Sequence, residues 1–205
     1  SYGDMDPAVA APYACSGLTA FSALKKIPDT LSEDWIIIIG AGGVGINGIL
    51  LSSAVHKAKI LVIDNNKEKR DKAIEAGAHA VFAPDEEEKI RSVIGIGASA
   101  AIDFVGMPET SDLALSLVKK GGMVVVIGLF GGSLKLSLPL VPMRSITLRG
   151  SYVGELRELR ELVDIIKSGK IKLMPVKKQD LSTANQAMSD LRAGKVNGRI
   201  VLIPS

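Results

Sequence analysis

The stretch WIIIIGAGGVGINGILLSSAVHKAKILVID, from Trp35 to Asp64, decides the fold. It begins with an apolar run that contains four consecutive isoleucines, which is typical of a strand buried on both faces of a parallel sheet. A glycine-rich turn and an apolar segment of helix length, residues 43–56, come next. A second β-branched run, residues 60–63, then leads to Asp64. The order strand, helix, strand predicts a βαβ unit.

The turn after the first strand has the spacing G-x-G-x-x-G, at Gly40, Gly42 and Gly45. The first glycine permits the tight turn, the second lets backbone approach a pyrophosphate, and the third lets the helix pack closely on the strand. The helix N-terminus, at Gly43 and Val44, would present unpaired N–H groups and the positive end of the helix dipole to phosphates. A strand-to-helix turn without a ligand is the alternative. The surrounding strand, helix and acidic residue favour dinucleotide binding.

Asp64 ends the second strand, where its carboxylate can accept hydrogen bonds from both hydroxyls of an adenosine ribose. A 2′-phosphate at this position would meet a like charge. Because Asn65 and Asn66 add no cation, the sequence favours NAD over NADP. Three nearby basic residues weaken that preference: Lys67, Lys69 and Arg70. A helix N-cap is the alternative role for Asp64, and one residue can serve both.

The composition fits a soluble α/β protein, since 47% of the 205 residues are hydrophobic and only 4% are aromatic. The net charge of +3 comes without a basic stripe of interleaved aromatic residues, so we expect no nucleic-acid partner. No apolar run reaches the ~18 residues of a membrane span, and no signal segment is visible. The single cysteine, Cys15, fits a reducing compartment. We therefore expect a cytoplasmic protein without a membrane partner.

From Trp35 onward, strand-like runs alternate with helical patterns. Strands are expected at residues 35–39, 60–63, 80–83, 100–104, 123–127 and 146–152, and helices at residues 43–56, 67–76, 85–94 and 108–119. This alternation predicts a doubly wound, six-stranded parallel sheet of the Rossmann type, in the order 3-2-1-4-5-6, with the ligand at the carboxyl ends of the strands. The loops at 105–108 and 128–132 combine glycine with apolar residues, which suits a flat ring or a plain strand-ending turn.

The segments around this alternation have another character. Residues 1–27 hold two short helical patterns, and residues 133–144 are proline-rich without a long helix, as in an apolar arm that covers a sheet edge or a partner. After an amphipathic helix at 155–167, residues 175–181 are expected to be extended, 182–192 helical and 198–203 a short strand. We predict a nucleotide-binding domain at residues 28–174, with 1–27 and 175–205 belonging to another domain.

Six stretches are similar to one known family: AAPYACSGLTAFSALKK, GAGGVG, VIDNNKEK, DFVG, VVVIGLFGG and GKVNGRIVLIP. They resemble the C-terminal part of the medium-chain dehydrogenase/reductase family, and its zinc-dependent alcohol dehydrogenases in particular. The likeness runs from about Asp6 to the end of the chain. It implies that residues 1–27 and 175–205 are remnants of the family's catalytic domain, most of which would precede Ser1.

The resemblance also implies roles for single residues. Cys15 lies where the family places one ligand of its catalytic zinc, and Thr19 lies where a residue touches the nicotinamide. Lys69 matches a lysine that reaches the adenosine ribose, and Arg199 matches an arginine near the pyrophosphate. The nicotinamide pocket is expected from four further residues: Val105, Ile127, Gly128 and Leu129.

A zinc site cannot be built on Cys15 alone, because a catalytic zinc takes three protein ligands. His56 and His79 fall at a helix end and a strand start, which explains both without a metal. The other ligands and the proton relay are expected upstream of Ser1. For Cys15 the alternative is a small buried thiol.

We therefore expect the NAD-binding portion of an enzyme that transfers hydride between a primary or secondary alcohol and NAD, inactive without the missing catalytic domain. The alternatives are a zinc-free quinone or enoyl reductase of the same superfamily, which Cys15 argues against, and a non-catalytic nucleotide-binding or dimerising module. The resemblance also implies a homodimer or tetramer that forms through the edge strand expected from Ile146 to Tyr152.

Overall fold

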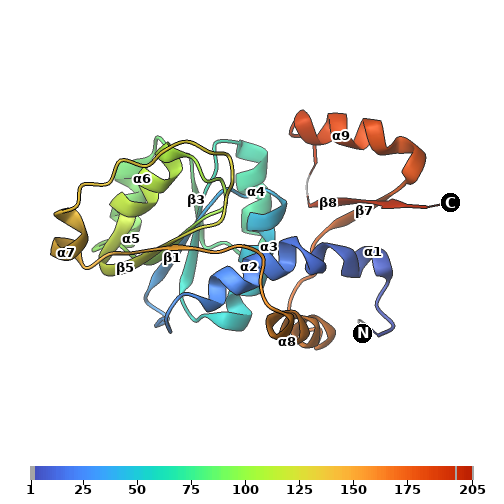
Figure 1. Cartoon of the computed structure of the whole chain (residues 1–205), viewed down its shortest axis with the longest axis horizontal. Helices are drawn as coiled ribbons and strands as arrows, with labels where there is room; N and C mark the ends of the chain where they lie inside the picture. Colours follow the sequence, from blue (N-terminus) through green and yellow to red (C-terminus); the bar gives the residue numbers. More distant parts are fainter. Residues whose placement is uncertain (1–2, 197, 205) are drawn as a thin grey trace.

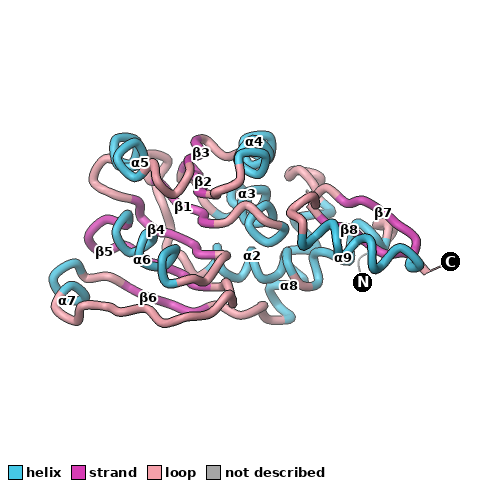
Figure 2. The backbone as a smooth tube through the Cα atoms, turned by 90° about the horizontal axis from the view of Figure 1, so that it is seen from above, coloured by secondary structure: helices cyan, strands magenta, loops and turns pink. Residues whose placement is uncertain are grey.

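The computed structural model describes residues 3–196 and 198–204. Its main sheet has six parallel strands in the order β3-β2-β1-β4-β5-β6, which confirms the predicted Rossmann topology. Figure 2 shows this order from above. The strands are β1 Trp35–Ile39, β2 Lys59–Ile63, β3 Ala80–Phe82, β4 Ala98–Asp103, β5 Val118–Val126 and β6 Thr147–Gly150.

The four isoleucines of β1 point alternately to the two faces of the sheet. Ile36 and Ile38 belong to a core cluster formed with helices α2 and α3, whereas Ile37 and Ile39 belong to a cluster formed with α5 and α6. All four are at most 2% exposed, so this strand has no solvent-facing side, as predicted. These helices are α2 Ser16–Lys25, α3 Gly43–Val55, α5 Glu87–Ile94 and α6 Pro108–Leu117.

Two further helices, α4 Lys67–Ala76 and α8 Leu156–Lys167, complete the face on which α2 and α3 lie. The chain enters this layer through α1 Pro7–Ala10 and the 3₁₀ turn η1 Ala11–Ala14. Asp6 is the N-cap of helix α1, because its carboxylate accepts a hydrogen bond from the Ala8 amide at 2.9 Å. None of the helices in the described residues combines the length and apolarity needed to cross a membrane.

The prediction for the fifth strand was too short. β5 begins at Val118, directly after α6, and its pairing with β4 jumps from Ala98↔Val118 to Ala100↔Met123. Gly121 has a φ of +77° within this irregular stretch. The proline-rich connection that follows holds only one short helix, α7 Leu140–Arg144, as expected from its composition.

The C-terminal segment forms a separate sheet of two parallel strands, β7 Val176–Asp180 and β8 Arg199–Ile203. The 3₁₀ turn η2 Leu181–Thr183 and helix α9 Ala184–Arg192 connect them. This unit lies beside the six-stranded sheet and contains the C-terminus (Figure 1). It does not extend the alternating sheet, which confirms the expectation from the sequence.

The two flanking segments contact each other. Asp6 forms an ion pair with Lys178 of β7, and the buried Tyr13 hydroxyl accepts a hydrogen bond from the Met174 amide at 2.9 Å. Helix α2, however, also packs deep in the core of the six-stranded sheet. The division at residues 27/28 and 174/175 therefore stays a prediction.

Candidate functional site

A cavity of about 420 Å³ lies at the carboxyl ends of β1, β2 and β4. The order of the sheet reverses between β1 and β4, and doubly wound proteins place their ligands at that point. The lining combines backbone of the glycine turn with polar and apolar side chains: Ile39, Gly40, Gly42, Gly43, Val44, Gly45, Ile63, Asp64, Asn65, Lys69, Pro84, Phe104, Val105, Met107, Thr110, Phe130 and Arg199.

The glycines of the turn have the geometry that the three predicted steric roles require. Gly40 has a φ of +91°, a conformation that L side chains rarely adopt. A Cβ on Gly45 would lie 1.8 Å from the Gly40 carbonyl oxygen, so only glycine permits the close approach of helix and strand. A Cβ on Gly42 would meet nothing within 4 Å, so it would point into open space. A ligand can therefore approach the backbone at Gly42.

The first turn of α3 supplies unpaired N–H groups to this cavity. The helix begins at Gly43, and Gly42, Gly43, Val44 and Gly45 all line the cavity. The N-cap residue, Gly42, has no side chain to bind the first amides. Since the first amides of a helix lack intrahelical acceptors, this end of α3 suits an anion.

Asp64 lies at the edge of the cavity and is only 8% exposed. Its carboxylate accepts hydrogen bonds from the Ala41 amide and from the Asn66 amide, both at 2.8 Å. These two bonds fix the carboxylate between the glycine turn and the loop after β2. Each carboxylate oxygen has a second lone pair for another donor. The N-cap of α4 is Asn66, which accepts from the Lys69 amide at 3.2 Å, so the alternative role of Asp64 as the cap was wrong.

Two cationic side chains line the same cavity. The Arg199 guanidinium lies over Gly43, because a Cβ added there would come within 2.6 Å of its Cζ. The buried Nε of Arg199 has no hydrogen-bond partner in the described part of the chain. Desolvation by burial lowers the pKa of Arg199, and the Coulombic interaction with Cys15 opposes this shift. The Lys69 ammonium makes no ion pair with any described residue.

Asp103, the last residue of β4, was not identified from the sequence. It is fully buried, and its carboxylate accepts from the amides of Val105 and Gly106 at 2.9 Å and from the hydroxyls of Thr110 and Ser111 at 2.8 Å. Val105 and Thr110 line the cavity. Asp103 thus holds the wall of the cavity that follows β4. The sequence did contain a signal for Asp103, because it is an acidic residue at the end of a buried strand, as Asp64 is.

The cavity brings together nine of the thirteen residues predicted to contact a coenzyme. The other four, Thr19, Ile127, Gly128 and Leu129, do not line it. Gly128 is nevertheless adjacent, since a Cβ on it would lie 1.9 Å from the Val105 carbonyl carbon. Thr19 is buried in α2, and Leu129 is 79% exposed. The coenzyme contacts of all thirteen stay predictions.

The described residues do not by themselves form a zinc site. In the part of the chain that the structure describes, no group of three or more His, Cys, Asp or Glu side chains could hold a metal. Cys15 is exposed, so its alternative reading as a buried thiol was wrong. His56 Nε2 lies 2.8 Å from the Leu24 carbonyl, and His79 Nδ1 accepts from the Ile60 amide at 3.0 Å. Both histidines therefore stabilise the fold.

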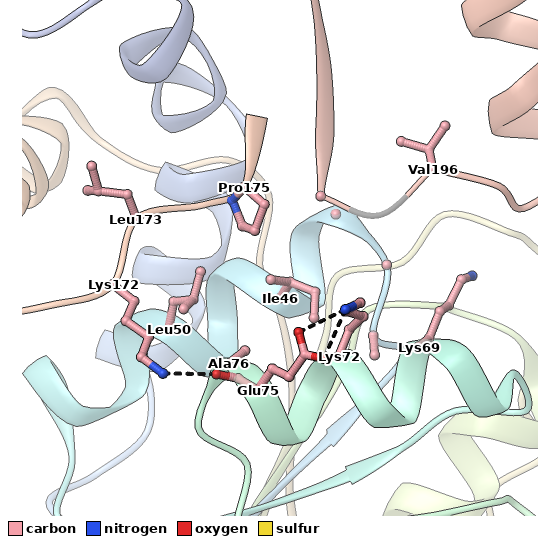
Figure 3. A pocket seen from close by; sticks show the side chains of 14 residues that line it. Ile46, Leu50, Lys69, Lys72, Glu75, Ala76, Lys172, Leu173, Pro175 and Val196 are labelled. Atoms are coloured by element: carbon pink, nitrogen blue, oxygen red, sulfur yellow. Dashed lines mark hydrogen bonds and ion pairs between the residues drawn. The ribbon is translucent and has the colours of Figure 1, made fainter. Parts of the chain in front are cut away.

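A second cavity, of about 350 Å³, is also lined by Lys69 (Figure 3). It shares Gly42, Gly43 and Lys69 with the first cavity, but Ile46, Leu50, Leu173 and Pro175 make it largely apolar. Two of its cations are already engaged by one residue, as Figure 3 shows: Lys72 pairs with the Glu75 carboxylate at 2.9 Å, and Lys172 donates to the Glu75 carbonyl at 3.0 Å. It suits two phosphates less well than the first cavity.

Comparison with known proteins gives the family. The model of the zinc-binding dehydrogenases matches residues 43–168, which is more than half of the chain. This chain belongs to the zinc-binding dehydrogenase family. An NAD-dependent alcohol dehydrogenase of Sulfurisphaera tokodaii is 34% identical over 199 residues, which are 95% of this chain and 57% of that protein.

Two further relatives in this family bear on the coenzyme and the fold. A D-arabinose 1-dehydrogenase (NADP(+)) of Saccharolobus solfataricus is 32% identical over 98% of this chain and 59% of its own length. The crystal structure of the alcohol dehydrogenase of Aeropyrum pernix superposes with a TM-score of 0.88 at 31% identity and covers 95% of this chain and 57% of that one. The chain thus spans somewhat more than half the length of the relatives that it matches.

Proposed function

We propose that this chain is the coenzyme-binding part of an NAD-dependent alcohol dehydrogenase. One cavity supports this proposal, because it combines open backbone at Gly42, a fixed carboxylate at Asp64 and a half-buried Arg199. The Nε of Arg199 has no hydrogen-bond partner among the described residues. A dinucleotide has complementary groups, since its pyrophosphate suits the helix N-terminus and the guanidinium, and its ribose hydroxyls suit the carboxylate.

The preference for NAD rests on Asp64, because the relatives named above include one NAD-dependent and one NADP-dependent enzyme. The Asp64 carboxylate is held at the cavity by two backbone amides and cannot turn away without losing both bonds. A 2′-phosphate would approach this carboxylate and be repelled. A ribose hydroxyl would donate to one of its remaining lone pairs.

The bound coenzyme would supply the acceptor for a hydride, and the chain would bind it, orient it and keep water from it. Arg199 and the first turn of α3 would hold the phosphates, while Asp64 and Lys69 would hold the adenosine ribose. The apolar wall of Val105 and Phe130 would exclude water next to the ring. Ile127, Gly128 and Leu129, in the loop after β5, would continue that wall, and Thr19 would approach the ring from α2.

Zinc belongs to the proposal for the intact protein only. Cys15, exposed at the N-cap of α2, would supply one thiolate ligand, and the remaining ligands would come from residues outside this chain. The exposed thiol also argues against a zinc-free quinone or enoyl reductase. Metal analysis of the full-length protein separates the two, because one tightly held zinc per chain excludes the zinc-free alternative.

Titration of this chain with NADH and with NADPH, followed by coenzyme fluorescence, tests the proposal. We expect NADH to bind at least about tenfold more tightly than NADPH. The reason is that the 2′-phosphate of NADPH would lie beside the Asp64 carboxylate, and such a contact between like charges lowers the affinity by about tenfold or more. Asp64→Asn should remove most of that difference. Lys67→Met is the control, because Lys67 pairs with Asp71 on an exposed surface. Equal or tighter binding of NADPH by the unmodified chain refutes the role of Asp64.

For the chain by itself, the absence of a metal-ligand cluster among its described residues favours a second candidate function, a nucleotide-binding or dimerising module without turnover. An assay of this chain with alcohol and NAD tests whether it turns over by itself, and we expect it to stay at background. Zinc-dependent turnover would show that the chain contains a complete site.

We also propose a small-molecule alcohol or carbonyl substrate, a homodimer or tetramer, and a cytoplasmic location, which the single cysteine supports. The assembly would form through β6, which among the described strands pairs with β5 alone and whose four residues are all exposed. Exposed apolar side chains surround this edge, among them Leu138, Met143, Leu148 and Tyr152. Such an edge with an apolar surround is a common site of assembly.

A further inference from the structure

Arg70 folds back from the first turns of α4 onto the loop after β2. Its Nη1 donates to the carbonyl oxygen of Asp64 at 2.7 Å and to that of Asn65 at 3.1 Å. Hydrogen bonds from a guanidinium to backbone carbonyls are charge-assisted and stronger than neutral ones. The guanidinium therefore clamps the peptide units that carry the Asp64 side chain.

The rest of the loop is held by its own atoms. The Asp64 carboxylate accepts from the Asn66 amide, and the Asn66 side chain caps α4. The Asp64 amide donates to the Phe82 carbonyl of β3 at 3.2 Å. Among the described residues, only Arg70 donates side-chain hydrogen bonds to the carbonyl oxygens of Asp64 and Asn65. Its removal would release the loop on the side away from the sheet.

Arg70 is also badly placed to bind a phosphate of the coenzyme. Of the three basic residues near Asp64, only Lys69 lines the cavity. Lys67 is paired with Asp71 at 2.8 Å, and Arg70 is engaged with backbone. Two of the three cations that weakened the preference for NAD thus have other partners. Arg70 can therefore hold Asp64 in place without contacting the coenzyme itself.

We infer that Arg70 is a positioning residue for coenzyme selectivity: it fixes the backbone at residues 64 and 65 so that the Asp64 carboxylate faces the cavity. The inference rests on the proposed function. It predicts that the loss of Arg70 weakens NADH binding and leaves the weaker NADPH binding unchanged. A direct contact between Arg70 and a 2′-phosphate predicts the reverse.

The test compares Arg70→Met and Arg70→Lys by fluorescence titration with both coenzymes. Arg70→Met should raise the Kd for NADH by about tenfold, the usual effect of losing one charge-assisted hydrogen bond, and should barely change the Kd for NADPH. Arg70→Lys keeps the charge and a donor, so it should recover most of the NADH affinity. Arg91→Met is the matched control, because Arg91 of α5 also donates to a backbone carbonyl, that of Ser116, but lies outside the cavity.

A double-variant cycle with Asp64→Asn shows whether Arg70 acts through Asp64. In the Asp64→Asn background, Arg70→Met should cause no further loss of NADH affinity. Additive losses, an unchanged ratio of the two Kd values, or a loss confined to NADPH would each overturn the inference. If circular dichroism shows that Arg70→Met does not fold, the same test is made with Arg70→Gln, using the ratio of its Kd values for NADH and NADPH. A wild-type chain that binds neither coenzyme refutes the proposed function itself, and the inference with it.

Discussion

At the scale of single residues, a substitution at Gly42 should change coenzyme binding without changing the stability of the fold. Its φ of −72° is an ordinary one, and an added Cβ would meet nothing within 4 Å. We expect Gly42→Ala to keep the stability of the chain within about 1 kcal/mol, yet to weaken NADH binding by at least about tenfold, because the methyl group occupies the space of the phosphates. Thermal melting and fluorescence titration of one preparation measure both effects. Unchanged affinity would mean that no ligand approaches this backbone.

Gly45 gives the opposite result, since a Cβ there would lie 1.8 Å from the Gly40 carbonyl oxygen. We expect Gly45→Ala to lower the free energy of unfolding by about 3 kcal/mol or more, because α3 must move away from β1. Urea denaturation measures this change. The prediction is wrong if the Gly45→Ala chain unfolds at the same urea concentration as Gly42→Ala.

How far the sequence predicts single residues depends on how local the cause is. The roles of the glycines follow from spacing, because steric conflict within one turn involves only neighbouring residues. The Asp103 network could not be predicted, since it depends on the exact distance between the end of β4 and the first turn of α6. The exposure of Cys15 depends likewise on tertiary packing.

At the scale of elements, an ion pair joins the starts of β1 and β5 across β4. Lys119 Nζ lies 2.7 Å from Asp34 Oδ1, and this hydrogen bond is the largest of the contacts that together lower the pKa of Asp34 from 3.8 to about 2. A carboxyl with a lowered folded-state pKa stabilises the fold above its unfolded pKa, and this contribution disappears as the pH falls from about 4 to about 2. Lys119→Met should therefore cost roughly 1–2 kcal/mol at pH 7 and much less near pH 2.

Denaturation by urea at several pH values checks this prediction. Lys67→Met is the control, because the pair of Lys67 with Asp71 is exposed and should contribute less than about 0.5 kcal/mol. A difference between wild type and Lys119→Met that persists unchanged at low pH would show that the effect comes from packing.

The elements themselves were predicted where apolar runs are continuous, as in β1 and β2. The start of β5 was missed because Lys119, Lys120, Gly121 and Gly122 have neither the β-branched composition nor the alternation of a strand. They join the strand only because β4 lies beside them and tolerates a shift in register. Pairing between distant segments decides such boundaries.

At the scale of the whole molecule, the sequence predicts that the segment after the Rossmann sheet does not extend that sheet. It does not predict how the N-terminal and C-terminal segments contact each other. The two parallel strands β7 and β8 are too few for an independently stable sheet, and all the side chains of β8 are at least partly exposed. They are supported instead by contact with the N-terminal segment, through Asp6 and Tyr13. Contacts between residues so far apart in sequence leave no periodic signal.

Assembly through β6 gives the last prediction. The strand is the edge of the sheet, Leu148 and Tyr152 are 43% and 78% exposed, and α7 extends the same border (Figures 1 and 2). A charge in the middle of an edge strand opposes pairing with a second copy. Leu148→Lys should therefore weaken the proposed dimer by at least about tenfold without unfolding the chain. Sedimentation velocity over a range of concentrations measures this, with Leu181→Lys, at an exposed position outside the six-stranded sheet, as the control. A wild-type chain that sediments as a monomer at high concentration, or an equal effect of both variants, would exclude β6 as the interface.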